Sequence, residues 1–191
     1  MRFVLFSLLL LAAMQATAQD SLTGVFRTID IGAELFGNNE GFSPGIRVEA
    51  AFNREYSISL KGGYTSFRKG HTGRHEDEAG EGYGFTVGYR HYFGKGVLRG
   101  IFLGAKTDCW FNTVRWKDGI GTTAEVNGVS KTTVIQPSME LGYNFLLAKQ
   151  RLVITPLIAF SVETNVATSG KPVDGGPLLL LGTTLSYRLR W

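Results

Sequence analysis

The sequence predicts an all-β protein, an eight-stranded antiparallel up-and-down transmembrane β-barrel preceded by a cleaved signal peptide. Three observations predict it. An apolar N-terminal run ends in a small-residue cleavage pattern, later segments alternate apolar with polar side chains, and the connections between these segments alternate between short and long. The composition agrees, because 25 Gly and 13 Phe beside only 5 Pro favour many strands joined by tight turns.

The N-terminus has the three parts of a secretory signal peptide. Arg2 supplies a positive start, Phe3 to Ala13 form an apolar run, and Ala16 to Ala18 form an A-x-A cleavage pattern. The apolar run is shorter than the about 20 residues that a spanning helix needs. We therefore expect residues 1–18 to be a signal peptide and residues 19–191 to be the barrel domain.

Eight segments of the mature chain show the alternation of a two-sided strand, with apolar side chains on one face and polar side chains on the other. Most have the about 9 to 11 residues that a tilted membrane strand requires. In order they are Val25 to Phe36, Gly45 to Asn53, Tyr56 to Phe67, Gly82 to Phe93, Gly100 to Phe111, Lys131 to Phe145, Leu152 to Asn165 and Leu178 to Trp191. Aromatic residues crowd the ends of these segments, as an interfacial girdle would.

The predicted connections also alternate in length. Short turns are expected at Asn53 to Glu55, Gly94 to Arg99 and Leu146 to Arg151. Longer loops are expected at Gly37 to Pro44, Arg68 to Glu81, Asn112 to Ser130 and Val166 to Pro177, although Trp110 to Val129 is rich enough in Trp and Thr to extend the flanking strands. Short turns at one rim and long loops at the other are typical of bacterial outer-membrane barrels.

The last segment separates its side chains strictly by face. Leu185, Tyr187, Leu189 and Trp191 share one face, and Arg188 lies on the other. Alternation that ends on an aromatic resembles the C-terminal signal by which outer-membrane β-barrels are recognised for assembly, here Tyr187, Leu189 and Trp191. With the signal peptide and eight alternating segments, this pattern resembles the small outer-membrane β-barrel families around the OmpA barrel domain and OmpX.

The resemblance implies an integral, monomeric protein of the bacterial outer membrane with structural, adhesive or lipid-contact roles. Its implied partners are the barrel-assembly machinery during insertion, outer-membrane lipid and lipopolysaccharide. Nucleic acid is not an expected partner, because loss of the signal peptide leaves 19 bases against 16 acids, a scattered net charge of +3.

Charged residues recur on the polar faces that would line the barrel interior. An eight-stranded barrel is just wide enough for its own side chains to fill it, so such charges must pair or be hydrated by trapped water. We therefore expect a filled, salt-bridged lumen rather than an open pore. The lumen charges predicted are Asp30, Glu34, Glu49, Asp108, Glu140 and Glu163, against Arg47, Lys61, Arg90, Lys106, Arg188 and Arg190.

Two alternative readings remain open. Pro137 and Pro156 fall inside neighbouring strands, where each removes a ladder donor, so a lateral seam there would let the barrel bind or pass a small hydrophobic molecule. Bulges and ordinary packing account for the same prolines. The other alternative is a secreted soluble barrel of lipocalin type, with apolar side chains facing inward and polar ones facing outward. The placement of the predicted lumen charges distinguishes this barrel from a membrane barrel.

No catalytic, cofactor or metal site is predicted. His71 and His75 lie close to acids in the Arg68 to Glu81 loop, but their spacing matches no defined metal motif. His91 lies at the end of a predicted strand, and we interpret it as an interfacial aromatic residue. Lipid A-modifying barrel enzymes use Ser and His together, and none of these histidines shows a His-x-Ser pairing. We therefore expect no enzyme activity.

Overall fold

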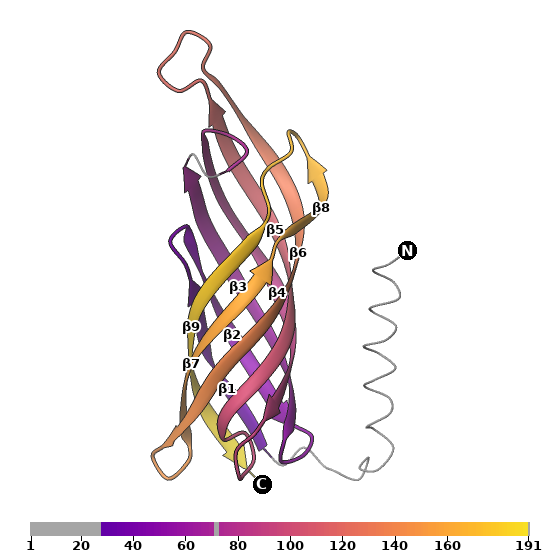
Figure 1. Cartoon of the computed structure of the whole chain (residues 1–191), viewed down its shortest axis with the longest axis vertical. Coiled ribbons are helices and arrows are strands. Elements are labelled where there is room, and N and C mark those ends of the chain that lie inside the picture. Colours follow the sequence, from indigo (N-terminus) through magenta and orange to yellow (C-terminus); the bar gives the residue numbers. More distant parts are fainter. Residues whose placement is uncertain (1–27, 71–72, 191) are drawn as a thin grey trace.

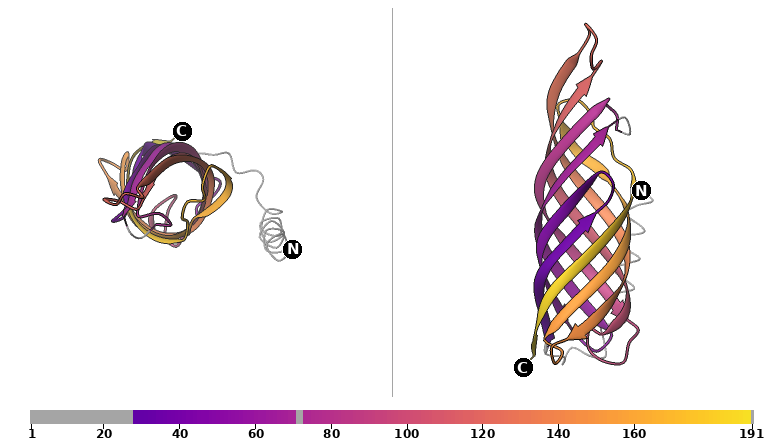
Figure 2. Two further views of the ribbon diagram at one scale, coloured as in Figure 1. Left: turned by 90° about the horizontal axis from the view of Figure 1, so that it is seen from above. Right: turned by 90° about the vertical axis from the view of Figure 1, so that its left-hand side faces the viewer.

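The computed structural model describes residues 28–70 and 73–190, in which nine strands form one antiparallel sheet. The strands are β1 (Thr28–Gly37), β2 (Gly41–Ala51), β3 (Tyr56–Gly70), β4 (Asp77–Tyr92), β5 (Gly100–Asp118), β6 (Val126–Leu147), β7 (Leu152–Val162), β8 (Thr164–Ser169) and β9 (Pro177–Arg190). Pairing of β1 with β9 and of β5 with β6 closes the sheet into a ring, seen from above in Figure 2. The predicted fold class is confirmed. The predicted signal peptide, His71 and Trp191 lie outside the described residues.

The ring has eight members because β7 and β8 are one strand with an interruption. Both pair with β6, through Ser161 opposite Ser138 in β7 and Thr164 opposite Ile135 in β8. The same register places Pro137, which lacks an N–H, opposite the last residue of β7. The backbone N–H of Glu163 instead donates to the carbonyl of Gly176 at 2.8 Å. The predicted loop from Val166 onward therefore begins as strand.

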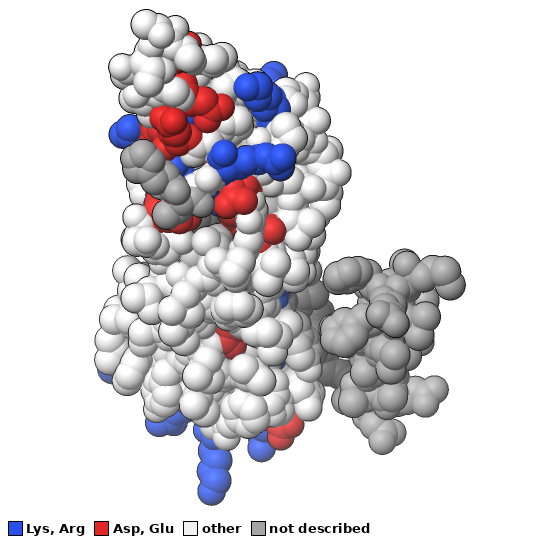
Figure 3. All heavy atoms as spheres, turned by 45° about the horizontal axis from the view of Figure 1, so that its top comes forward, with Lys and Arg blue, Asp and Glu red and all other residues white. Residues whose placement is uncertain are grey.

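The alternation predicted from the sequence becomes an inside and an outside. Along β5, buried and exposed side chains alternate from Gly100 to Lys117. The outward apolar side chains are exposed, with Leu60 60%, Leu181 66% and Tyr83 70% accessible. Figure 3 shows the result as a middle band largely free of charge between two charged ends. Soluble monomers rarely expose a continuous apolar belt of this kind, so the outer surface suits hydrocarbon.

Several predicted loops are shorter than expected because the flanking strands continue into them, and over Trp110 to Val129 this is the extension that the Trp and Thr residues indicated. Strand β5 has 19 residues and β6 has 22, well beyond the about 9 to 11 that cross a bilayer, and they pair up to Asp118 opposite Val126. The first connection shortens to residues 38–40. Figure 1 shows the β5–β6 hairpin rising furthest above the barrel. Alternation continues there, since Val114 and Trp116 face inward and Arg115 faces outward, so cross-strand pairing persists.

The other end of the barrel has short turns, as predicted. Residues 52–55, 93–99 and 148–151 connect the strands there, and β9 ends beside them at Arg190. We call these three turns with Arg190 the lower rim. None of the described residues belongs to a helix long and apolar enough to span a membrane.

Candidate functional site: a sealed lumen and its two ends

In the part of the chain that the structure describes, the central network of the lumen has equal numbers of buried acids and bases. Five carboxylates face five cationic side chains, all contributed by alternate residues of the strands, and every one is buried. They are Asp30, Glu34, Glu49, Asp108 and Glu140, with Arg47, Lys61, Arg90, Lys106 and Arg188. Because the charges cancel, the interior has no net sign that would select an ion.

Glu34 lies among three cations. One of its carboxylate oxygens is 3.4 Å from Arg47 and 4.0 Å from Arg90, and the other is 3.2 Å from Lys61. These residues come from β1, β2, β3 and β4, which are consecutive in the ring. The ion pairs therefore connect neighbouring strands across the inside of the barrel.

Arg90 links this group to the opposite wall. Its guanidinium contacts Glu49 at 3.2 Å and Glu140 of β6 at 2.5 Å. Glu49 also accepts hydrogen bonds from the hydroxyls of Ser57 at 2.5 Å and Tyr92 at 2.7 Å. A buried carboxylate is tolerable only when its lone pairs are satisfied in this way.

Aromatic rings complete the environment of the cations. The Lys106 ammonium lies 3.6 Å from the centre of the Phe36 ring, and the Arg90 guanidinium lies 4.1 Å from that of Phe102. Lys61 is 5.5 Å from the Trp110 ring. Cation–π contacts of this kind partly replace lost hydration.

The turn between β4 and β5 seals the lower end of the lumen. Leu98 has a left-handed φ of 46° and is fully buried, packed with Tyr92 and Phe102 in the apolar core. Arg188 holds Asp30 through bonds of 2.7 and 2.6 Å and also donates to the Leu98 carbonyl at 2.9 Å. The prediction of this turn missed its role, although the apolar pair Val97-Leu98 among glycines was a signal.

The upper mouth of the lumen is nearly closed. A cavity of about 50 Å³ remains between Phe36, Lys61, Trp110 and the Lys69–Glu163 pair. That volume holds a few waters, whereas pockets for small molecules measure about 300–1,000 Å³. The lumen therefore offers neither a water-filled pore nor a ligand chamber of ordinary size.

Two predicted lumen charges lie away from the main network. Glu163 is at the mouth, 3.0 Å from Lys69, a residue expected in a loop. Burial lowers the pKa of Lys69, but the Glu163 carboxylate outweighs burial and raises it above its ordinary value. The placement of Arg190 in the lumen is wrong. Arg190 is exposed and donates to Gln150 at 2.8 Å, because it lies at the open end of β9.

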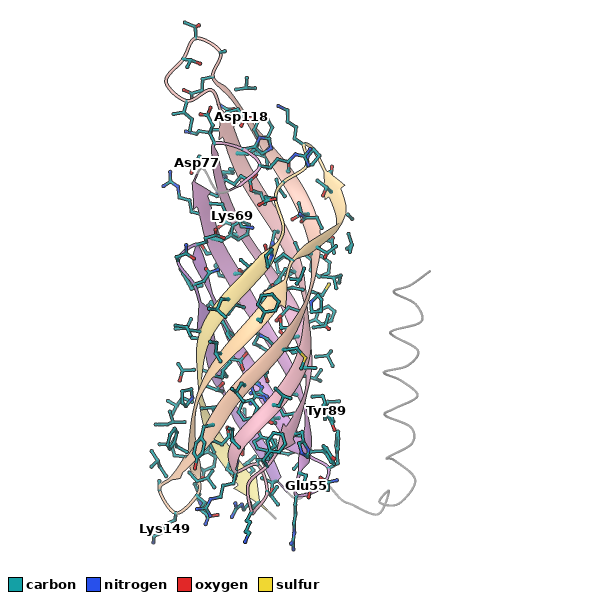
Figure 4. The ribbon with its side chains drawn as sticks, in the orientation of Figure 1. Glu55, Lys69, Asp77, Tyr89, Asp118 and Lys149 are labelled. Atoms are coloured by element: carbon teal, nitrogen blue, oxygen red, sulfur yellow. The ribbon has the colours of Figure 1, made fainter. Side chains whose placement is uncertain are left out.

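Above the belt, a group that we call the upper clasp ties the loops together: His75, Trp116, Asp118, Lys171 and Pro172. His75 stacks on Trp116 with ring centres 4.5 Å apart, and its two ring nitrogens lie 2.8 Å from an Asp118 carboxylate oxygen and 3.1 Å from the Pro172 carbonyl. The Lys171 ammonium lies 4.4 Å from the Trp116 ring. Figure 4 shows Asp118 near the top, above Lys69. Because the clasp residues are far apart in sequence, sequence reasoning did not find it.

The acids Asp77 and Glu78, in the segment predicted as the Arg68 to Glu81 loop, have separate partners. Asp77 receives two hydrogen bonds from Arg68, at 2.9 and 3.0 Å. Glu78 accepts from the backbone N–H groups of Arg74 and His75, each at 3.1 Å. Within residues 28–70 and 73–190, no group of three or more His, Cys, Asp or Glu is arranged to hold a metal ion.

His91 lies at the lower end of β4 among aromatic rings. Its ring centre is 4.7 Å from that of Tyr56 and 4.5 Å from that of Phe93. Such a cluster is what an interfacial aromatic girdle requires, and it involves no serine hydroxyl.

The two prolines both face the β6–β7 ladder. Extending the register sets Pro137 opposite Val162 and Pro156 opposite Tyr143, and neither pair is among the ladder pairs of β6 with β7. Side chains bridge both interruptions from within, through a 2.7 Å contact between Ser138 and Ser161 and a 2.7 Å bond from Thr155 to Asn144. The lumen behind them is filled by buried Val153 and Leu157. The seam is therefore closed, and a passage for a hydrophobic molecule is not supported.

Two residues of the predicted assembly signal, Tyr187 and Leu189, lie on β9. Tyr187 and Leu189 are exposed on the outer face of β9, whereas Arg188 between them points into the lumen. These positions match the face that the alternation assigns to lipid.

No protein-family model matches this chain, and no curated protein matches its sequence. Among solved structures, it is similar to the N-terminal β-barrel domain of Pseudomonas aeruginosa OprF, at 10% identity and a TM-score of 0.46, covering 85% of this chain and 98% of that one. Ail, the attachment invasion locus protein of Yersinia pestis, matches at 10% identity and a TM-score of 0.48, covering 85% and 95%. Neisserial surface protein A matches at 13% identity and a TM-score of 0.43, covering 86% and 95%.

Proposed function

We propose that this protein is an integral outer-membrane β-barrel with a structural and surface role in the cell envelope, and that it conducts no solute. The observation that carries the proposal is the combination of an apolar outer belt with a filled, charge-neutral lumen. A closed barrel satisfies every backbone group within the bilayer, so the chain can span a membrane without a helix. Such a barrel anchors in the membrane the hairpins and turns that project from its two ends.

The proposed orientation places the lower rim in the periplasm and the long hairpins outside. Short periplasmic turns and long outer connections are the usual arrangement in such barrels. Exposed aromatics at Phe42, Tyr64, Tyr83 and Phe111 then mark the outer headgroup level. The β5–β6 hairpin stands above this level, and the upper clasp ties its β5 strand to the neighbouring loops.

The proposed partners follow from the same arrangement. Arg115, Lys117 and Lys131 are exposed just above the aromatic level and suit the phosphates of lipopolysaccharide. The outer face of β9, with Tyr187 and Leu189, is the segment that the barrel-assembly machinery would recognise during insertion. Export by residues 1–18 would precede that step.

Heat modifiability of the outer-membrane fraction tests the proposal. Cells expressing the full chain are fractionated, and the protein is run on SDS gels with and without boiling, beside a variant that lacks Leu189 to Trp191. We expect a faster-migrating unboiled band in the outer membrane that the truncation removes. A soluble protein without a mobility shift would overturn the membrane assignment.

Conductance separates a sealed barrel from a pore. The folded protein reconstituted in planar bilayers should give no stable open level, because the Leu98 turn and the Arg90 network fill the lumen. Steady single-channel openings would refute the closed lumen while leaving the barrel itself intact.

A further inference from the structure

The two ends of the barrel differ sharply in charge. Six exposed bases belong to the lower rim, namely Arg54, Lys95, Arg99, Lys149, Arg151 and Arg190. Its only described acid that is exposed is Glu55. The upper end carries both signs, as the red and blue side chains at the top of Figure 3 show, whereas the bottom edge in that view is mostly blue. A basic rim is complementary to an anionic surface.

Three of these bases gather at one pocket. Lys149, Arg151 and Arg190 line a hollow of about 230 Å³ together with Gln150 and Tyr187, which we call the lower-rim pocket. The β6–β7 turn shapes one side of it, with φ of 47°, 56° and 68° at Ala148, Lys149 and Gln150. Three successive left-handed residues without glycine are uncommon and are maintained only where the surrounding structure holds them.

Two of the three pocket bases have neutral partners. Arg190 donates to the Gln150 side-chain oxygen at 2.8 Å, and Arg151 donates to the Tyr187 hydroxyl at 3.0 Å. Arg188, which also lines the pocket, already donates two hydrogen bonds to the lumen acid Asp30. No described carboxylate lines the pocket. Among residues 28–70 and 73–190, its positive charge is therefore oriented but not neutralised.

The pocket lies at the edge of the apolar belt. Tyr187 and Leu189 line it and also belong to the outer face of β9, which continues upward through Leu185. In Figure 4 Lys149 lies at the lower tip of the barrel and Glu55 is on a separate turn. A ligand here meets cations at its polar end and hydrocarbon-facing side chains beyond it. Phospholipids with negative headgroups have that chemistry, whereas a soluble acidic peptide or nucleic acid would leave the apolar edge unused.

We propose that the lower-rim pocket binds the phosphate of an anionic phospholipid in the periplasm-facing leaflet. This inference rests on the proposed membrane function, and it adds a defined lipid site to it. The phosphodiester would accept hydrogen bonds from Lys149, Arg151 and Arg190, while the acyl chains lie along the outer face of β9.

Calorimetric titration of the folded protein in maltoside detergent tests the site. The probes are short-chain phosphatidylglycerol, short-chain phosphatidylcholine and inorganic phosphate. Each base near an anionic lipid contributes about a fivefold factor in affinity. We therefore expect phosphatidylglycerol to bind at least about tenfold more tightly than phosphatidylcholine, and a K149Q/R151Q/R190Q variant to lose that preference.

The matched control removes the same number of exposed bases from the other two turns of the lower rim, in an R54Q/K95Q/R99Q variant, because none of these three residues lines the pocket. The control should keep the preference for phosphatidylglycerol. Equal affinity for the two lipids, or equal loss in both variants, would overturn the proposal. Inorganic phosphate binding as tightly as phosphatidylglycerol would overturn the lipid assignment in favour of a free-anion site.

Every sample is first checked for the heat-dependent gel shift. Absence of the shift in the parent protein refutes the proposed barrel function itself. A normal shift with no lipid preference refutes only the lower-rim pocket as a lipid site. The two failures are thus distinguishable.

Discussion

Replacing Arg90 with Met should destabilise the barrel more than any surface charge change. Arg90 is only 1% exposed and contacts Glu49, Glu140 and Glu34. Glu34 and Glu49 keep Arg47 as a partner, but the described ion pair of Glu140 is with Arg90. Removing one partner of a buried pair costs about 3–5 kcal/mol, because the other charge is left uncompensated.

A second substitution separates charge from packing. The R90M/E140Q variant removes the orphaned carboxylate together with its base, so we expect it to recover about half or more of the lost stability. The coupling energy between the two positions should then reach about 2 kcal/mol. The hydroxyls of Ser57 and Tyr92 still satisfy Glu49 in both variants.

Denaturant unfolding in lipid vesicles measures these values. Fluorescence of Trp110 and Trp116 reports the folded state, since both rings are buried, and the gel shift supplies an independent probe. The exposed pair Arg115 and Glu81 provides the control, where R115M should cost no more than about 1 kcal/mol. A single R90M variant within about 1 kcal/mol of the parent, or strictly additive effects, would show that the network does not hold the lumen.

Three further predictions address the ends and the seam. The hydrogen bond from His75 holds the pKa of Asp118 below its usual range, so the contribution of that pair to clasp stability is present above about pH 4 and is lost as pH falls through the depressed pKa. Hydrogen exchange at residues 74–76 and 171–174 should therefore accelerate only below about pH 4, and D118N should abolish this acceleration. Leu98→Ala should lower the free energy of unfolding by about 2–5 kcal/mol, because truncating this fully buried side chain leaves a cavity beside Tyr92 and Phe102. A loss under about 1 kcal/mol would mean that the turn is not packed in the lumen. P137A with P156A should leave uptake of an apolar fluorescent probe unchanged, because Ser138–Ser161 and Thr155–Asn144 contacts close the seam, and reduced uptake would reinstate a lateral gate.

The sequence by itself determined which side chains face inward. Side-chain direction in a strand repeats every two residues, so the positions of Glu34, Arg47 and Lys61 relative to the apolar face follow from local alternation alone. The same alternation predicted the eight strands of the ring, and the short gaps between alternating segments predicted the turns of the lower rim. It failed at Arg190, because facing inward buries a side chain only where the opposite wall is present.

Only the tertiary structure decided which inward residues meet. Arg90 and Glu140 are 50 positions apart in the chain, and His75 and Pro172 are 97 apart. Their contacts depend on the stagger of the closed sheet and on the paths of connections, which no local pattern encodes. The entry of Leu98 into the lumen has the same origin, since long-range packing stabilises a conformation that the turn alone does not specify.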